Sequence, residues 1–304
     1  MNKFMKVLAA SALVATTLVG CSSGSSAKYA KVGFGMVISY DEDAKQQTAT
    51  TATVGLDSDG KIAYVDVDAT YAPNDHDSSK TKKELKEDYG MKGASAAKGA
   101  IEGGKEWYEQ ADAFEKFCVG KTVDEVSADI VDGYAKEGSD LASGCTIAVS
   151  AFQTALSKAV ENAVEVEADK VGAGEIVSYS EEDGKVTSSI VAVALDTDGK
   201  VVWCNLDSAY SPNGVDETKS KKELKEDYGM KSTSAGIGKI DGGGEWYEQA
   251  AAFEEYCKGK TADEIAATEV ENGKAKEGTD LAAGCTIAVT DFLAAVAEAC
   301  AAAQ

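Results

Sequence analysis

A threonine that could accept a covalent group ends a phrase that this chain contains twice. The phrase is Asp140-Leu-Ala-Ser-Gly-Cys-Thr146 in one place and Asp280-Leu-Ala-Ala-Gly-Cys-Thr286 in the other. A threonine hydroxyl becomes a nucleophile when a partner activates it. The small residues before it, including Gly144 and Gly284, would let a second protein close on the backbone. One such phrase would mean little, and the duplication makes both threonines candidate modification sites.

The two phrases belong to a repeat that covers most of the chain. Lys31-Val-Gly-Phe-Gly and Lys170-Val-Gly-Ala-Gly open two stretches that stay in register at an offset of 139 residues, which one insertion later raises to 140. Such a repeat is far longer than the periods of solenoid proteins. We therefore expect two tandem homologous domains, residues 31–163 and residues 164–304, with the same chemistry in each.

Charge and histidine content exclude several functions. The formal net charge of −22 is spread through both copies, so nucleic acid is an implausible partner. The single histidine, His76, aligns with Val215 of the second copy. It therefore cannot be a duplicated catalytic base or metal ligand, and we assign no catalytic residue.

The cysteines give no metal signature. Apart from Cys21, four of them repeat and two do not: Cys118, Cys145, Cys257, Cys285, Cys204 and Cys300. None has the C-x-x-C spacing that is typical of zinc, iron–sulfur and haem sites, so no metal is expected. Disulfides within each copy, Cys118 with Cys145 and Cys257 with Cys285, and buried free thiols both remain open.

The amino terminus predicts a lipid anchor. Lys3 and Lys6 precede an apolar run over residues 7–19 that is too short to span a membrane, so residues 1–20 are expected to be a signal peptide. The run ends at Leu18-Val-Gly-Cys21, which resembles a bacterial lipobox. Acylated Cys21 would then begin a flexible tether over residues 21–30 and hold the protein on the outer face of the cell membrane.

Alternating apolar residues predict three strands in each copy. In the first copy they cover Val32–Tyr40, Thr48–Leu56 and Lys61–Asp68, and Asp57-Ser-Asp-Gly60 is a hairpin turn between the last two. Within the third strand, Ala63, Val65 and Val67 are expected to face the core, as are Val202, Cys204 and Leu206 of the second copy. Cys145, Ile147 and Val149 predict one more short strand before a final helix that Ser150 caps.

Helices are expected between these strands, which makes the fold class α+β. Thr81-Lys-Lys-Glu84 and Ser220-Lys-Lys-Glu223 are capping boxes for helices that end at Gly90 and Gly229, and their lysines are expected to form a solvated face. A glycine-rich loop follows each helix and could bind a phosphate. The next helix in each copy has one apolar stripe, made of Trp107, Ala111, Phe114 and Cys118 in the first and of Trp246, Ala250, Phe253 and Cys257 in the second.

The duplicated phrase resembles the acceptor motif of the ApbE-type flavin transferases. In that motif an Asp, small residues and Gly-x-Thr lead to a threonine that receives FMN from FAD through a phosphoester bond. The resemblance implies one covalent FMN on Thr146 and one on Thr286, with Asp140, Gly144, Asp280 and Gly284 belonging to the recognised motif. Cysteine stands before each threonine, where the motif usually has alanine.

Longer segments resemble the PplA lipoproteins, which are flavinylated surface proteins of Gram-positive bacteria. The segments of this chain that carry the resemblance are Lys82-Lys-Glu-Leu-Lys-Glu-Asp-Tyr-Gly-Met-Lys92, Glu106-Trp-Tyr-Glu-Gln110 and Gly120-Lys-Thr-Val-Asp-Glu125. Each segment has its counterpart in the second copy. This resemblance implies a redox carrier, rather than an enzyme with its own substrate, for extracellular electron transfer. Its partners would be a flavin transferase, a membrane respiratory donor and acceptors outside the cell.

Several residues of each copy are candidates for contact with the flavin. Tyr108 and Tyr247 lie off the apolar stripe and are expected to stack on the flavin ring. Trp107 and Trp246 are expected either to pack in the core or to touch the cofactor. Met91-Lys92 and Met230-Lys231 are expected near the polar edge of the ring, where a lysine would offset the charge of the reduced flavin.

A second function stays open at this point. A surface lipoprotein that binds a peptide or small solute could use the repeat for avidity, and its cleaved leader could act as a signal. The colour of the purified protein and its intact mass distinguish these hypotheses, because two covalent FMN groups would make the protein yellow and heavier than the polypeptide.

Overall fold

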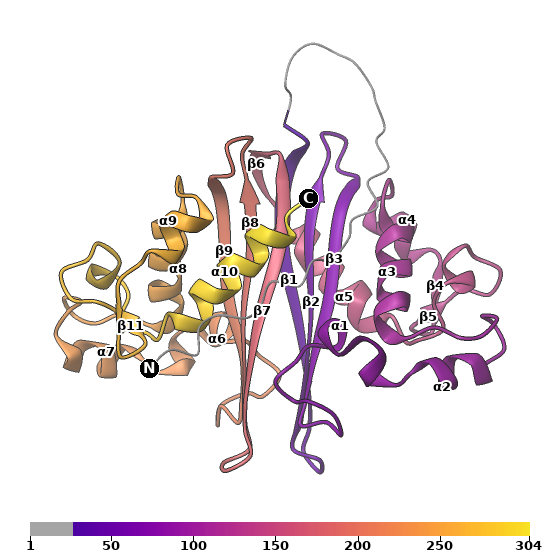
Figure 1. The fold of residues 1–304 in the computed structure, drawn as a ribbon, viewed down its shortest axis with the longest axis horizontal. Coiled ribbons are helices and arrows are strands. Elements are labelled where there is room, and N and C mark those ends of the chain that lie inside the picture. The colour runs from indigo at the N-terminus through magenta and orange to yellow at the C-terminus, as the bar shows by residue number, and fades with distance from the viewer. Residues whose placement is uncertain (1–26) are drawn as a thin grey trace.

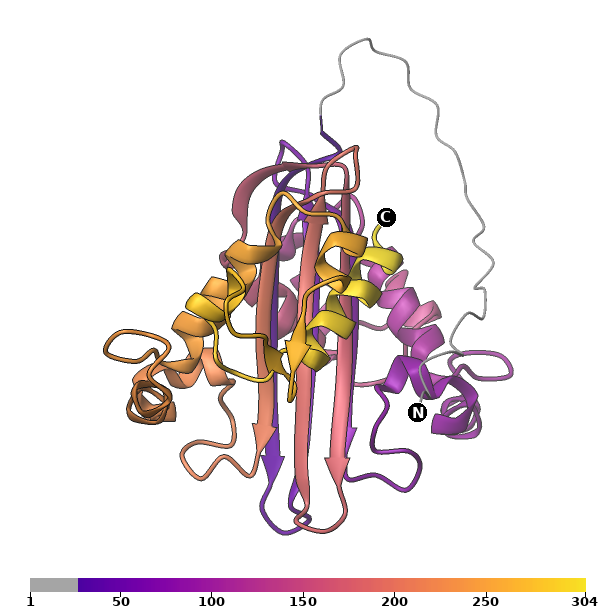
Figure 2. The ribbon, with the colours of Figure 1, turned by 60° about the vertical axis from the view of Figure 1, so that its left-hand side comes forward.

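A computed structural model describes residues 27–304 and confirms the α+β class. Two antiparallel sheets stand face to face in the centre, and helices cover the outer face of each (Figure 1, Figure 2). The layers are therefore helices, sheet, sheet, helices. The expected signal peptide, Cys21 and most of the tether lie outside the described residues.

The first half contains three long strands, an edge strand, two short strands that pair with each other, five α-helices and two 3₁₀ helices. Their bounds are β1 (Tyr29–Asp41), β2 (Gln46–Leu56), β3 (Ile62–Ala72), α1 (Lys82–Leu85), η1 (Lys86–Tyr89), α2 (Lys92–Ala97), α3 (Trp107–Cys118), α4 (Val123–Ser127), β4 (Ile130–Val131), β5 (Tyr134–Ala135), η2 (Leu141–Ser143), α5 (Ser150–Glu161) and β6 (Val164–Ala168). Here η marks a short 3₁₀ helix.

The second half repeats these elements in the same order, except for the edge strand β6. Their bounds are β7 (Lys170–Ser180), β8 (Lys185–Leu195), β9 (Val201–Ser211), α6 (Lys221–Leu224), η3 (Lys225–Tyr228), α7 (Lys231–Ile237), α8 (Trp246–Cys257), α9 (Ala262–Ala266), β10 (Val270–Glu271), β11 (Lys274–Ala275), η4 (Leu281–Ala283) and α10 (Thr290–Ala302). The three long strands, the hairpin turns and the capping boxes expected in each copy are present in both halves.

The edge strand β6 corrects the expected boundary between the repeats. Residues 164–168 were assigned to the second copy, but β6 pairs with β1 and extends the first sheet, whose order is β3-β2-β1-β6. The second sheet has the order β7-β8-β9. Gln304 exchanges two backbone hydrogen bonds with Val171 at the place where Val164 meets Val32 in the first half, so the pairing itself is repeated.

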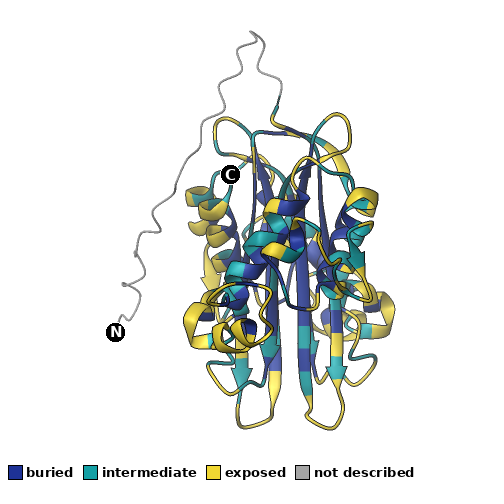
Figure 3. Cartoon of the chain, turned by 90° about the vertical axis from the view of Figure 1, so that its right-hand side faces the viewer, coloured by how far each residue is buried: buried dark blue, intermediate teal, exposed yellow. Residues whose placement is uncertain are grey.

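Each half has its own apolar core between sheet and helices. The expected stripe of Trp107, Ala111, Phe114 and Cys118 is buried against β2 and β3, and the equivalent stripe is buried in the second half. Ala63 and Val202 face the other side of their sheets, against expectation, because a bulge after the hairpin shifts the register by one residue. Figure 3 shows that the strands are buried along most of their length, whereas their lower hairpin ends are exposed.

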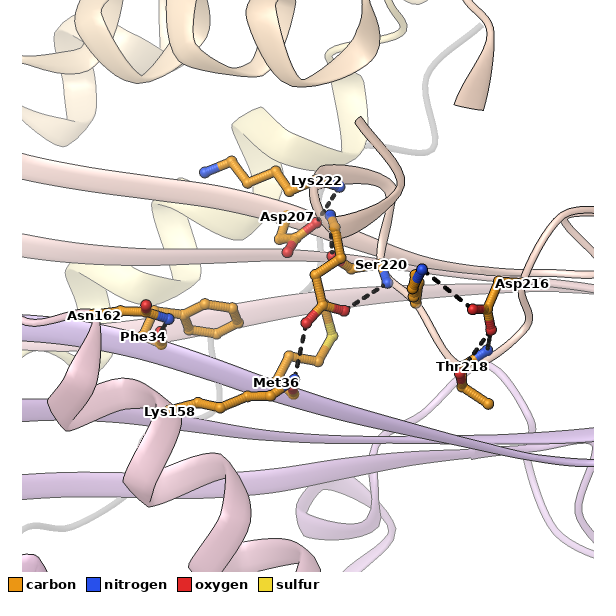
Figure 4. A network of polar contacts seen from close by, with 11 residues as sticks. Phe34, Met36, Lys158, Asn162, Asp207, Asp216, Thr218, Ser220 and Lys222 are labelled. Carbon is orange, nitrogen blue, oxygen red and sulfur yellow. Dashed lines mark hydrogen bonds and ion pairs between the residues drawn. The ribbon is translucent and has the colours of Figure 1, made fainter. Parts of the chain in front are cut away.

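A third apolar layer joins the two sheets. Phe34, Met36 and Ile38 of β1 pack against Ile190 and Ala192 of β8. At one edge of this contact, the Lys158 ammonium of α5 pairs with the Glu223 carboxylate at 2.8 Å and donates to the Met36 carbonyl oxygen at 3.0 Å (Figure 4). The two halves therefore form a continuous packed body.

The repeated Gly-x-Gly of β1 and β7 lets a helix lie directly on each sheet. An added Cβ at Gly35 would come within 2.2 Å of the Ala155 carbonyl oxygen of α5, and one at Gly174 within 2.3 Å of the Ala295 carbonyl oxygen of α10. Real Cβ atoms do not approach backbone oxygen so closely. The glycines of the strands and the alanines of the final helices therefore together allow the close contact between helix and sheet.

Changing Gly174 to alanine is expected to lower the free energy of unfolding by about 1–3 kcal/mol, because the new methyl group must push α10 away from β7. Urea denaturation measures this change. The matched control is Gly236→Ala in α7, where a Cβ would meet nothing within 4 Å, and where alanine is expected to stabilise the helix by up to about 1 kcal/mol. Equal stability of the two variants would contradict the close approach.

Candidate functional site

The repeated phrase forms an irregular loop between a short 3₁₀ helix and the final helix of each half. The strand expected through Cys145, Ile147 and Val149 is absent. The backbone there forms single hydrogen bonds to separate parts of the chain, so it does not pair with another strand. The Val149 amide donates to the Gly133 carbonyl oxygen at 2.7 Å, for example. The expected cap by Ser150 is also wrong, since the helix begins at that residue.

A glutamine from the preceding long helix holds each threonine. In the second half, the Thr286 amide and hydroxyl both donate to Gln249 Oε1, at 2.7 and 2.8 Å. In the first half, Thr146 makes the same two hydrogen bonds to Gln110 Oε1, at 2.8 and 3.0 Å. The glutamine thus fixes both the loop and the side-chain rotamer of the threonine.

The glycine of the phrase is required for packing. A Cβ at Gly144 would lie 2.8 Å from the Ala113 methyl group of α3, and one at Gly284 would lie 2.9 Å from the Ala252 methyl group of α8. The loop can therefore sit on the helix that carries the glutamine only if this residue has no side chain. Asp140 and Asp280 are exposed, where another protein can reach them.

Thr286 opens into a cavity of about 360 Å³. Ligand pockets in proteins have volumes of roughly 300–1,000 Å³. Apolar side chains of Met230, Trp246, Ile287 and Phe292 form much of its lining. Of the residues proposed from the sequence, the structure thus brings together Thr286, Trp246 and Met230.

Other candidate contacts do not reach this cavity. Tyr247 and Lys231 are absent from its lining. The Tyr247 hydroxyl instead donates to the Glu226 carboxylate at 3.0 Å, as Tyr108 does to Glu87. That bond raises the pKa of Tyr108 to about 12.

The candidate lysine of the first half has the same position as its counterpart in the second. Lys92 is exposed at the start of α2, as Lys231 is at the start of α7. In the second half, the expected contacts Tyr247 and Lys231 therefore lie outside the lining of the cavity, whereas Trp246 and Met230 belong to it.

The glycine-rich loops are partly helical and do not offer a free phosphate site. Residues 92–97 and 231–237 form α2 and α7. At the start of α8 the carboxylate of Glu245 caps the helix and accepts a hydrogen bond from the Met230 amide at 2.8 Å. Glu106 does the same for α3 and Met91. These carboxylates would repel a phosphate from the helix amino termini.

The two halves differ at the mouth of the site. In the first half, the Lys98 ammonium donates to the Thr146 carbonyl oxygen at 2.7 Å and lies 5.6 Å from the ring centroid of Tyr134. Ile237 and Lys274 take these positions in the second half, and both line the cavity. Lys98 therefore covers the loop of Thr146, whereas the loop of Thr286 borders open space.

Sequence reasoning missed two lysines of this region. Lys221 lines the cavity, and its Nζ lies 4.7 Å from the ring centroid of Tyr210 and 5.6 Å from those of Tyr228 and Trp246. In the first half, Lys82 lies over three equivalent rings at 4.8, 5.3 and 5.5 Å: Tyr71, Tyr89 and Trp107. The expected solvated face is therefore wrong for these residues.

The neighbouring lysines are also held inside the structure. Lys83 pairs with Asp66 at 2.5 Å and with Glu115 at 2.6 Å, and Lys222 pairs with Glu254. One feature of the sequence indicates that these lysines are more than solvated surface residues. The segment that contains them is identical in both copies, and residues that only face solvent do not require such identity: Lys-Lys-Glu-Leu-Lys-Glu-Asp-Tyr-Gly-Met-Lys.

All six described cysteines are free thiols, which is one of the two alternatives that the sequence left open. Burial raises the pKa of Cys118 to about 12 and that of Cys145 to about 11. These thiols are therefore protonated at neutral pH and serve as small core residues.

Comparisons with protein-family models, with curated proteins and with solved structures found no match. Within residues 27–304, no helix is long and apolar enough to cross a membrane. The same part of the chain has no group of three or more histidine, cysteine or acidic residues that could hold a metal ion.

Proposed function

We propose that this protein is an extracellular electron-transfer flavoprotein, anchored to the outer face of the cell membrane through acylated Cys21, with one covalent FMN on Thr146 and one on Thr286. The observation that carries the proposal is the cavity that Thr286 lines. The same Thr–Gln arrangement recurs at Thr146, as a duplicated modification requires.

The residues around Thr286 suit a flavin. An isoalloxazine ring is flat and largely apolar, with polar atoms along one edge. Trp246, Ile287 and Phe292 offer apolar and aromatic surface, whereas Lys221, Ser189 and Thr233 offer polar groups. When bound, FMN would supply the redox chemistry, and the protein would supply position and electrostatics.

The chain's own contribution to attachment is a fixed hydroxyl. The Thr286 oxygen would form a bond to the phosphorus of the FMN half of FAD while the pyrophosphate bond breaks, so that AMP leaves and the hydroxyl proton is lost. Gln249 holds the hydroxyl in one rotamer but cannot take its proton, because a neutral amide is not a base. The base and the binding of FAD therefore fall to the ApbE-type transferase, which would contact exposed Asp280 and the small residues after it.

A covalent bond suits a carrier that faces the medium, because a dissociable cofactor would be lost. Electrons would enter from a donor of the membrane respiratory chain and leave to acceptors outside the cell. In this role the protein is a redox carrier and needs no substrate pocket beyond the flavin sites.

The test is to produce the full chain with and without an ApbE-type transferase, and to measure visible absorption and the mass of tryptic peptides. With the transferase, the peptides that contain Thr146 and Thr286 are each expected to gain one FMN, and the protein is expected to be yellow. The chain made without it is the control and is expected to be colourless. A colourless, unmodified chain in the presence of an active transferase would favour the alternative, a lipoprotein that binds a peptide or small solute in the same cavity.

A further inference from the structure

The lining of the Thr286 cavity includes one lysine of the repeated Lys-Lys-Glu-Leu segment, Lys221. Lys221 begins α6, and the capping box of Ser220 and Glu223 together with the bond from the Lys222 amide to Asp207 at 3.2 Å fixes this short helix on β9 (Figure 4). Among the described residues, no carboxylate lies within 4 Å of the Lys221 ammonium, whereas Lys222 beside it pairs with Glu254. Two adjacent lysines thus have different environments.

Aromatic rings take the place of the missing carboxylate. The negative face of an aromatic ring attracts an ammonium, and three rings lie within about 6 Å of the Lys221 ammonium. Rings do not replace the hydrogen bonds that the ammonium loses on leaving water, so burial lowers the pKa of Lys221 to about 8, against the opposing effect of Asp207. An anion in the cavity would supply those hydrogen bonds.

The arrangement occurs in both halves, which separates it from chance. Lys82 has three equivalent rings, and burial lowers its pKa to about 8 as well. Other residues near the two threonines differ: Ile237 stands at the position of Lys98, and Lys274 at that of Tyr134. The lysine surrounded by aromatic rings is nevertheless present in both halves. Lys274 and Asp291 are the other charged residues in the lining of the second cavity, and their opposite charges leave Lys221 as its net cation.

We propose that Lys221 is the anion-binding residue of the Thr286 cavity, and that its ammonium donates to an anionic oxygen of the ligand that Thr286 carries. This inference rests on the proposed function. Two parts of FMN could supply the oxygen, namely the phosphate and the ring edge that gains negative charge on reduction. Lys221 is a positioning and tuning residue, since the chemistry remains that of the flavin.

The first experiment uses the unmodified full chain and follows tryptophan fluorescence during titration with FMN, riboflavin and inorganic phosphate. Lys221→Met is expected to lose at least tenfold in affinity for FMN, which equals about 1.4 kcal/mol. If the phosphate is the partner, inorganic phosphate competes with FMN and riboflavin binds weakly. If the ring edge is the partner, riboflavin and FMN bind alike.

The second experiment uses the flavinylated chain with Thr146→Ala, so that only Thr286 carries flavin. If Lys221 favours the reduced over the oxidised form tenfold, Lys221→Met lowers the two-electron midpoint potential by about 30 mV. If Lys221 binds the phosphate instead, Lys221→Met leaves the midpoint potential unchanged and shifts the ³¹P resonance of the phosphoester. The matched control is Lys200→Met, an exposed lysine of the β8–β9 hairpin, which removes the same charge elsewhere.

The two proposals fail in different ways. Absence of flavin in the chain made with transferase would count against the proposed function, and the titration of the unmodified chain would still measure the lysine site. Normal flavin content in Lys221→Met, with unchanged FMN affinity, midpoint and ³¹P shift, would overturn the lysine proposal alone. In that case the three rings would only be packing around an alkyl chain.

Discussion

Changing Thr146 and Thr286 together to alanine is expected to abolish covalent flavin, and changing either one alone is expected to halve it. Each threonine lies in its own half with its own glutamine, so neither site depends on the other for its hydroxyl. The measurement is flavin absorbance per polypeptide, together with peptide mass, for chains made with the transferase.

Two further variants separate loss of the hydroxyl from loss of the fold. Thr286→Val keeps the shape of the side chain, which is only 6% exposed, and is expected to lose the flavin as completely as alanine does. Thr154→Ala removes an exposed hydroxyl of α5 that bonds within its own helix, and is expected to keep both flavins. Two flavins on the double alanine variant would rule out both threonines as attachment sites.

The parts of the fold that depend on nearby residues could be predicted from the sequence. Thr81 and Glu84 bond each other's backbone three residues apart, and Asp57 accepts from two amides of its own turn. Such local contacts leave a pattern that can be recognised without knowing what surrounds it. The apolar stripe from Trp107 to Cys118 is similar, because helical spacing alone places it on one face.

What the sequence did not predict depends on distant partners. β6 joins the first sheet because Val164 meets Val32, more than a hundred residues earlier. Lysines at the start of a charged helix are usually solvated, and only the packing of β9 and α8 around α6 shows that Lys221 is enclosed by rings. The glutamine that holds Thr286 lies 37 residues before it, where no spacing rule connects the two.

The contact between the sheets has a second edge where an ion pair is missing. Glu298 stands at the position of Lys158, and Glu84 stands at that of Glu223. Nearby, Glu175 replaces Met36 and is buried against the Thr70 hydroxyl. Burial, and then the charge of Asp68, raises the pKa of Glu175 to about 8. Burial, and then the charge of Glu84, raises the pKa of Glu298 to about 7.

These carboxyl groups are expected to make the protein less stable as the pH rises from about 5 to 8. Both have folded-state pKa values above their ordinary value of 4.5, so in this range the folded protein binds protons that the unfolded chain has released. The free energy of unfolding then falls by up to about 1.4 kcal/mol per pH unit for each group. Buried Asp68 and Asp207, with pKa values raised to about 6, act in the same direction at the lower end. Urea denaturation at pH 5, 6.5 and 8 measures the slope.

Glu298→Lys is expected to convert this edge into a copy of the other one, in which the Lys158 ammonium pairs with Glu223 at 2.8 Å. The new lysine can reach Glu84, so the variant is expected to be more stable than the wild type at pH 8 and to have a flatter pH dependence. Glu298→Gln is the matched control, because it removes the repulsion without adding an ion pair, and it should fall between the two. A wild-type stability that rises from pH 5 to pH 8, or a lysine variant less stable than the glutamine variant, would contradict this account.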